Sequence, residues 1–106
     1  MFLLKKITKS QIEKLVEKAC HNPSKLFQIE GRGYLKKGGY ADIVIVDPNA
    51  PQTVSKENIL YKCGWSPFEG TTFSSSVKQT FVNGNLTFNK GVFDDSTKGK
   101  RLTFDR

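Results

Sequence analysis

The chain has 106 residues, of which 37% are hydrophobic, and a formal net charge of +7 at pH 7. This length suits one domain with one core, and the hydrophobic content excludes wholesale disorder. No stretch approaches the ~20 apolar residues of a membrane span, and the opening MFLLKK is apolar and then basic, the reverse of a secretory signal. We therefore expect a cytoplasmic protein whose two cysteines, Cys20 and Cys63, are reduced thiols.

The positive charge raises the question of nucleic-acid binding, because clustered Lys and Arg side chains release counterions from phosphates. The clusters of basic residues lie apart from one another, in the N-terminal segment, in a glycine-flanked turn at residues 36–37 and near the C-terminus. Solvated faces explain this spread better than one basic surface, so nucleic acid is not the expected partner. A stand-alone basic module that binds an anionic partner, nucleic acid included, remains the alternative.

Residues 8–20 are predicted to form a helix. Thr8 and Gln11 fit a capping box, and Ile7 and Ile12 occupy the positions of a hydrophobic staple around it. Apolar side chains then recur with helical spacing on one face, at Ile12, Leu15, Val16, Ala19 and Cys20. This stripe predicts that one side of the helix faces a core.

The helix is expected to end at Asn22, where the chain begins a second helical piece at residues 23–27. Asn is a good N-cap, and Pro23 has the backbone angle of a first helical position. Glycine-rich turns at residues 31–39 lead to the continuous β-branched run at 43–46, which is typical of a strand buried on both faces. The prolines at 48 and 51 end this strand.

The second half of the chain predicts a short capped turn and a β-hairpin. Ser55 is placed to cap a turn that runs to Leu60. Strands at 77–82 and 85–88 flank Asn83-Gly84, the dipeptide that favours a two-residue turn with two positive φ angles. That register would place Phe81 opposite Leu86 and Thr80 opposite Thr87. The predicted fold class is α+β, an N-terminal helical segment followed by a small β-sheet or β-sandwich-like domain.

Side chains that could perform chemistry are sparse. The single histidine, His21, lies at a helix end, and a hydrolytic metal site needs three or more converging ligands. Cys20 belongs to the apolar stripe and points away from His21, so the two do not form a nucleophile pair. The glycines around Arg32 lack the third glycine of a dinucleotide loop, and Asp42 and Asp47 lie on opposite faces of a strand.

Three segments together resemble the cyclic amidohydrolase family, which includes dihydroorotases, hydantoinases and allantoinases. HNPSKLF at 21–27 is similar to the Asn-Pro motif of the family's last barrel helix. The second segment, residues 31–48 with GGYADIVIVDP at its end, is similar to the stretch that leads from barrel to β-domain. The third segment runs from KCGWSPFEG at 62–70 through VKQTFVNGNLTF at 77–88. Its Cys-Gly-Trp version points to the dihydroorotase branch.

The resemblance implies that residues 1–30 end a TIM-like barrel and residues 31–106 form a small composite β-domain, completed by strands from the N-terminal end of the parent enzyme. The chain would be the C-terminal, non-catalytic part of a zinc amidohydrolase that interconverts dihydroorotate and carbamoyl aspartate in pyrimidine synthesis. The family's metal ligands match no position here, so we expect no cofactor and no activity in this chain alone. Its expected partner is the barrel portion, or a second copy that joins through an open β-edge.

Two residues depart from the family pattern, which usually has alanine after the Asn-Pro pair and glycine after the phenylalanine. Ser24 and Gln28 occupy these positions here. The departure predicts a looser turn after Phe27.

The loop KCGWSPFEG contains the one tryptophan of the chain and is interpreted as a packing seam rather than a site. Glu69 is its one carboxylate, and the family places the loop in the β-domain. Trp65 and Phe68 would cover a hydrophobic edge, Pro67 would fix the turn, and Gly70, like Gly64, would permit a bend.

Overall fold

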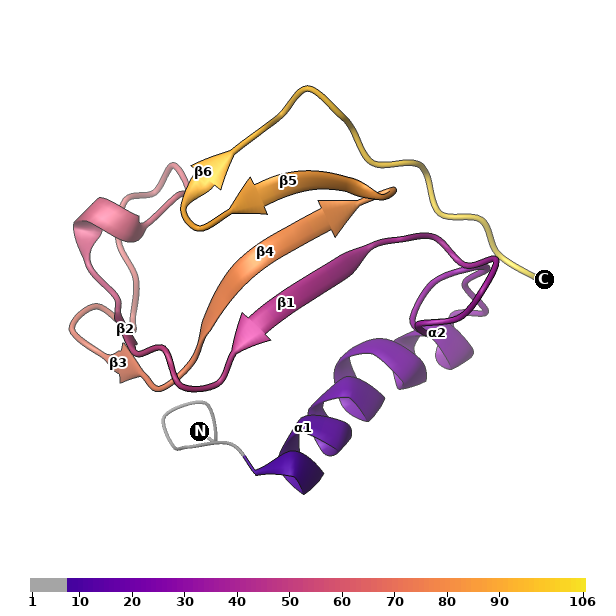
Figure 1. Cartoon of the computed structure of the whole chain (residues 1–106), viewed down its shortest axis with the longest axis horizontal. Coiled ribbons are helices and arrows are strands. Elements are labelled where there is room, and N and C mark those ends of the chain that lie inside the picture. The colour runs from indigo at the N-terminus through magenta and orange to yellow at the C-terminus, as the bar shows by residue number, and fades with distance from the viewer. Residues whose placement is uncertain (1–7) are drawn as a thin grey trace. The chain divides into compact units, whose positions relative to one another are not determined.

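The computed structural model describes residues 8–106 (Figure 1). These residues divide into two compact units, one formed by residues 46–76 and the other by residues 8–45 together with 77–106. The larger unit contains the helices and most of a four-stranded sheet, which gives an α+β chain. The predicted boundary between residues 30 and 31, where the end of a barrel would meet a β-domain, stays a prediction.

The helical segment of the larger unit consists of α1 (Lys9–Val16), the π-helical turn η2 (Glu17–His21) and α2 (Asn22–Leu26). The predicted capping box is confirmed: the Thr8 side chain accepts from the Gln11 amide at 3.3 Å, and the Gln11 side chain accepts from the Thr8 amide at 2.9 Å. The predicted staple includes Ile7, which lies outside the described residues.

The expected second helical piece at residues 23–27 exists as α2, but the expected N-cap role of Asn22 is wrong. Asn22 has helical angles, φ −64° and ψ −44°, and its amide donates to the Glu17 carbonyl, so the backbone stays helical from η2 into α2. Pro23 explains the geometry, because proline cannot donate to the carbonyl four residues back and its ring crowds that carbonyl. One wide π-helical turn before Pro23 accommodates the ring and lets the helix continue.

The turn after Phe27 is closed, which corrects the expectation of a looser turn. Gln28 has a φ of 55°, its amide donates to the Lys25 carbonyl, and the Ile29 amide donates to the Ser24 carbonyl at 2.9 Å. These two bonds and the left-handed residue between them make a Schellman motif. Glycine, which the resemblance leads us to expect at the position of Gln28, would suit this left-handed conformation.

Replacing Gln28 by glycine should stabilise the chain by roughly 0.5–1 kcal/mol. A left-handed residue with a side chain costs ~1–2 kcal/mol, and the extra entropy of unfolded glycine offsets part of the gain. Urea unfolding measures the change, and Lys25→Gly, in a helical position, is the control that should lose ~1 kcal/mol. A loss of similar size in Gln28→Gly would contradict the assigned turn.

The sheet contains β1 (Ile43–Asp47), β4 (Ser76–Val82), β5 (Asn85–Asn89) and β6 (Val92–Phe93), in that spatial order (Figure 1). β4 and β5 are antiparallel, and Asn83 and Gly84 between them have φ angles of 51° and 80°. Phe81 lies opposite Leu86, as expected. Thr80 lies opposite Phe88 rather than Thr87, because the register shifts between Thr80 and Phe81.

The smaller unit contains β2 (Gln52–Thr53) and β3 (Thr72–Phe73), a short antiparallel pair that the sequence did not indicate. The Thr53 and Thr72 hydroxyl oxygens are 2.7 Å apart across this pair. Ser55 caps the 3-10 turn η3 (Lys56–Asn58) through a capping box with Asn58, so the expected turn exists but ends before Leu60.

Apolar side chains are at most partly covered throughout residues 8–106. In this described part of the chain no hydrophobic residue is buried, and the one buried residue is Ser24, which is 7% exposed. In β1, Val44, Ile45 and Val46 are 56%, 43% and 49% exposed, so the expectation that this strand is buried on both faces is wrong for the chain by itself. α1 also has no buried residue.

Candidate functional site

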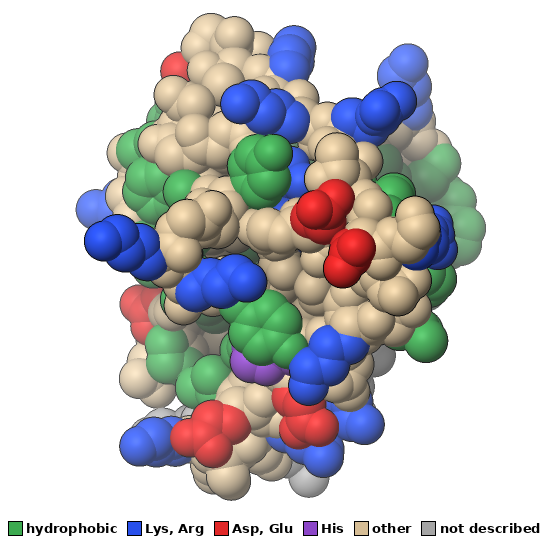
Figure 2. All heavy atoms as spheres, turned by 90° about the vertical axis from the view of Figure 1, so that its right-hand side faces the viewer, with side chains coloured by type: hydrophobic (Ala, Val, Ile, Leu, Met, Phe, Trp, Pro, Cys, Tyr) green, Lys and Arg blue, Asp and Glu red, His purple; other side chains and the backbone are tan. Residues whose placement is uncertain are grey.

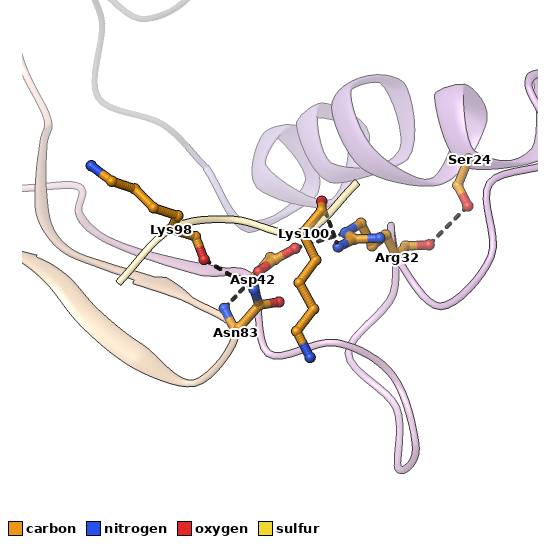
Figure 3. A network of polar contacts seen from close by, with 6 residues as sticks. All are labelled: Ser24, Arg32, Asp42, Asn83, Lys98 and Lys100. Atoms are coloured by element: carbon orange, nitrogen blue, oxygen red, sulfur yellow. Dashed lines mark hydrogen bonds and ion pairs between the residues drawn. The ribbon is translucent and has the colours of Figure 1, made fainter. Parts of the chain in front are cut away.

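The most connected polar cluster of the described chain is a network formed by Ser24, Arg32, Asp42 and Asn83 (Figure 3). It begins at the helical segment, where the Ser24 hydroxyl donates to the Arg32 carbonyl at 2.8 Å and lies 3.3 Å from the Ile29 carbonyl. Ser24, which departs from the family pattern, therefore fastens α2 to the segment that follows it.

Arg32 and Asp42 form the ion pair at the centre of this network. Arg32 Nε donates to Asp42 Oδ2 at 2.8 Å, and the guanidinium carbon lies 4.0 Å from the centroid of the Tyr40 ring. The Arg32 side chain is 13% exposed, which makes the pair stronger than an ordinary surface ion pair. A flat guanidinium suits this place, because it can stack on an aromatic ring while it bonds to a carboxylate.

Asp42 connects the helix side of the network to the β4–β5 turn. The Asn83 backbone amide donates to Asp42 Oδ1 at 2.9 Å, and this bond is the main reason why the pKa of Asp42 lies below its ordinary value. Partial burial raises the pKa, and the hydrogen bond and charge of Arg32 lower it further. The carboxylate is therefore ionised at neutral pH.

The glycines on either side of Arg32 allow this close packing. Gly33 has a φ of 89°, and a Cβ atom there would lie 2.5 Å from Ser24 Cβ and 2.7 Å from the Cys20 carbonyl oxygen. At Gly31, with a φ of 70°, a Cβ atom would lie 2.9 Å from the Tyr40 ring. The sequence indicated turns at these glycines but missed the network. The available signal was Arg32 between two glycines, with Asp42 further along the chain, directly before β1.

His21, the single histidine of the chain, stacks on Tyr34 with ring centroids 4.1 Å apart and an interplanar angle of 7°. Figure 2 shows this histidine, coloured purple, beneath a hydrophobic side chain. Cys20 and Cys63 are free and exposed. Residues 8–106 contain no group of three or more His, Cys, Asp or Glu side chains that could hold a metal ion, so a zinc site does not fit the described residues.

The loop at residues 62–70 is only partly packed within its own unit. Phe68 meets the edge of Phe73 with ring centroids 5.9 Å apart and an interplanar angle of 63°. Gly70 has a φ of 85°, and its amide donates to the Val54 carbonyl at 2.8 Å. Trp65 is 61% exposed, and Pro67 is also exposed. A seam that includes Trp65 would need cover from outside the described residues, and it stays a prediction.

No helix in residues 8–106 has the length and apolar character that a membrane crossing requires.

Comparison with known proteins gives consistent similarities. A model of the amidohydrolase family matches residues 4–87. The chain is 42% identical over 77 residues to the dihydroorotase of Endomicrobium trichonymphae, which covers 73% of this chain and 18% of that protein. It is 44% identical over 81 residues to the dihydroorotase of Acetivibrio thermocellus, covering 76% and 19%.

The allantoinase of Desulfitobacterium hafniense is 31% identical over 94 residues, which cover 89% of this chain and 21% of that protein. The chain thus spans about a fifth of the length of the curated relatives it matches.

Proposed function

Because this chain belongs to the amidohydrolase family, we propose that it is the non-catalytic C-terminal part of a dihydroorotase-like zinc amidohydrolase. The parent reaction is the hydrolysis of dihydroorotate to carbamoyl aspartate and its reversal. Residues 1–30 correspond to the last barrel helix, and residues 31–106 correspond to a composite β-domain with its Asn-Gly hairpin. The similarity to two dihydroorotases at 42% and 44% identity favours this branch over other cyclic amidohydrolases.

One observation carries the proposal: within residues 8–106 the apolar side chains are half-buried or exposed, and none is fully buried. The chain's residues are 37% hydrophobic, yet none of the hydrophobic ones among residues 8–106 is buried. A domain of this size normally buries roughly two thirds of the surface that its unfolded chain exposes. The exposed side of β1 and the apolar stripe of α1 are surfaces that the barrel portion of a larger enzyme would cover.

The activity test uses the purified chain. We expect no hydrolysis of dihydroorotate and no stoichiometric zinc after extensive dialysis, because the described residues offer no three-ligand cluster. The Acetivibrio thermocellus dihydroorotase is the positive control in the same assay. Hydrolysis by this chain alone, or one zinc ion per chain, would overturn the non-catalytic assignment.

By itself the chain is expected to self-associate through β1. This strand is first in the order of the described sheet, its apolar run contains no proline or lysine, and Val44, Ile45 and Val46 are about half exposed. An apolar edge of this kind favours pairing with another strand. Light scattering over a dilution series should show a dimer of the wild-type chain. Val44→Lys should abolish this dimer, whereas Leu35→Lys, a control at another exposed position, should preserve it. A strictly monomeric wild-type chain would contradict the prediction.

Trp65→Ala tests the proposed seam. In the chain alone, at concentrations where it is monomeric, the free energy of unfolding should fall by less than ~1 kcal/mol, because Trp65 is 61% exposed. In a complex with the barrel portion, the same variant should bind at least tenfold more weakly, as a lost aromatic anchor does. Leu35→Ala, at another exposed position, is the matched control. Equal affinity of Trp65→Ala and the wild type would place the seam elsewhere.

The basic-module alternative is favoured by the net charge of +7. Figure 2 shows Lys and Arg side chains interspersed with acidic and hydrophobic ones on the face drawn. Titration with a nucleic acid at low salt separates the two functions, because a module of this kind would bind with a steep salt dependence. We expect no saturable binding of the nucleic acid to this chain.

A further inference from the structure

The segment at residues 98–105 runs along residues 28–32 of the crossover, the connection at residues 27–42 between α2 and β1. The Glu30 amide donates to the Thr103 carbonyl at 2.9 Å, and the Asp105 amide donates to the Gln28 carbonyl at 2.9 Å. Ile29 and Phe104 form an isolated antiparallel bridge between these bonds. Figure 1 shows this yellow segment arriving beside the end of α2.

The same segment also bonds to two members of the polar network, Arg32 and Asn83 (Figure 3). Arg32 Nη2 donates to the Lys100 carbonyl at 3.3 Å, and Asn83 Nδ2 donates to the Lys98 carbonyl at 3.5 Å. Both contacts use backbone carbonyls, so the lysine side chains themselves are not needed for them. Arg32 therefore holds Asp42 with one nitrogen and the segment with another.

No side chain of residues 98–106 is fully buried, and the large apolar ones, Leu102 and Phe104, are 40% and 38% exposed. Backbone hydrogen bonds, together with these partly covered side chains, hold this segment in place. Segments with few buried contacts open locally at a small part of the global free energy of unfolding. Opening would uncover the Arg32 guanidinium, whose side chain is 13% exposed when the segment is in place.

We propose that residues 98–105 form a releasable strap that is latched by Arg32, so that the strap and the Arg32–Asp42 ion pair close and open together. The strap is a conformational device of this chain: when it is closed it fixes the direction of the crossover, and when it is open it frees the crossover. The strap would operate in the same way whether or not the chain derives from an enzyme.

Asp105→Pro tests the strap in the full chain, because proline removes the amide that donates to Gln28. Asp105→Ala is the matched control, since it changes the side chain and keeps the amide. The first readout is the rate of limited tryptic cleavage after Lys100 and Arg101. The second is hydrogen exchange of the Asn83 amide, which bonds to Asp42 at the far side of the network.

We expect both rates to rise roughly threefold to tenfold in Asp105→Pro, the factor that one backbone hydrogen bond is worth, and to stay unchanged in Asp105→Ala. Faster cleavage with unchanged exchange at Asn83 would overturn the coupling, and no change in either rate would overturn the strap. Lost protection of the Asn22 amide would reveal global unfolding. In that case Arg32→Lys, which keeps the charge but loses Nη2, replaces Asp105→Pro as the test variant. The same two rates, tryptic cleavage and exchange of the Asn83 amide, are then measured.

Discussion

Gly33→Ala should lower the free energy of unfolding by about 2–5 kcal/mol, the largest loss expected from a single added methyl group in this chain. The left-handed backbone costs a non-glycine residue ~1–2 kcal/mol, and overpacking adds ~1–3 kcal/mol. The overpacking is severe because the new Cβ would lie 2.5 Å from Ser24 Cβ and 2.7 Å from a backbone oxygen. Neither neighbour is the end of a flexible side chain.

Gly38→Ala separates the two contributions. Gly38 has a φ of 87°, close to the 89° of Gly33, but nothing lies within 4 Å of the position that an added Cβ would take. This control should lose only the backbone part, ~1–2 kcal/mol. Denaturant unfolding of both variants measures the difference. Equal losses in Gly33→Ala and Gly38→Ala would show that the crossover does not pack against α2 in solution.

Asp42→Asn should cost about 2–3 kcal/mol. Removing one partner of a buried ion pair typically costs ~3–5 kcal/mol, because the remaining charge is left without compensation. Asp42 itself is 33% exposed, which reduces the penalty, whereas the Arg32 side chain left behind is only 13% exposed. Asp95→Asn, a neutralisation at an exposed position outside the network, is the control and should stay within ~0.5 kcal/mol of wild type.

The same variant should also flatten the acid limb of the stability curve. Because the folded chain lowers the pKa of Asp42 below its ordinary 3.8, ionised Asp42 stabilises the fold. This contribution is fully present above 3.8 and is lost as the pH falls through the lower folded pKa. Unfolding measured between neutral and strongly acidic pH should therefore lose more free energy in wild type than in Asp42→Asn. Parallel curves would contradict the assigned role of Asp42.

Local chemistry made some parts of this fold predictable. Thr8 with Gln11 and Ser55 with Asn58 are capping pairs whose partners lie three residues apart, so the sequence contains the whole interaction. The strand β1 was also predictable, because its continuous β-branched run lies in one short stretch of the sequence. The pairing beyond Phe81 was not, because the register shift depends on how two strands twist against each other rather than on the turn alone.

The network was less predictable because its members are far apart in the sequence. Asp42 meets the amide of Asn83, and Arg32 meets the carbonyl of Lys100, through contacts that no periodicity indicates. Ser24 and Gln28 were visible as departures from a family pattern, but the pattern does not say that Ser24 gains two carbonyl contacts or that Gln28 adopts a positive φ. The exposure of β1 likewise depends on what lies beside the chain, which composition does not reveal.

The most direct test of the proposed function is complementation. A dihydroorotase from Acetivibrio thermocellus, truncated to remove the stretch that matches this chain, is mixed with this chain or with its own missing segment as the positive control. We expect the truncated enzyme and this chain each to be inactive alone, and we expect dihydroorotate hydrolysis to return when they are combined. Recovery with the enzyme's own segment, but neither activity nor a complex with this chain, would contradict the proposed function.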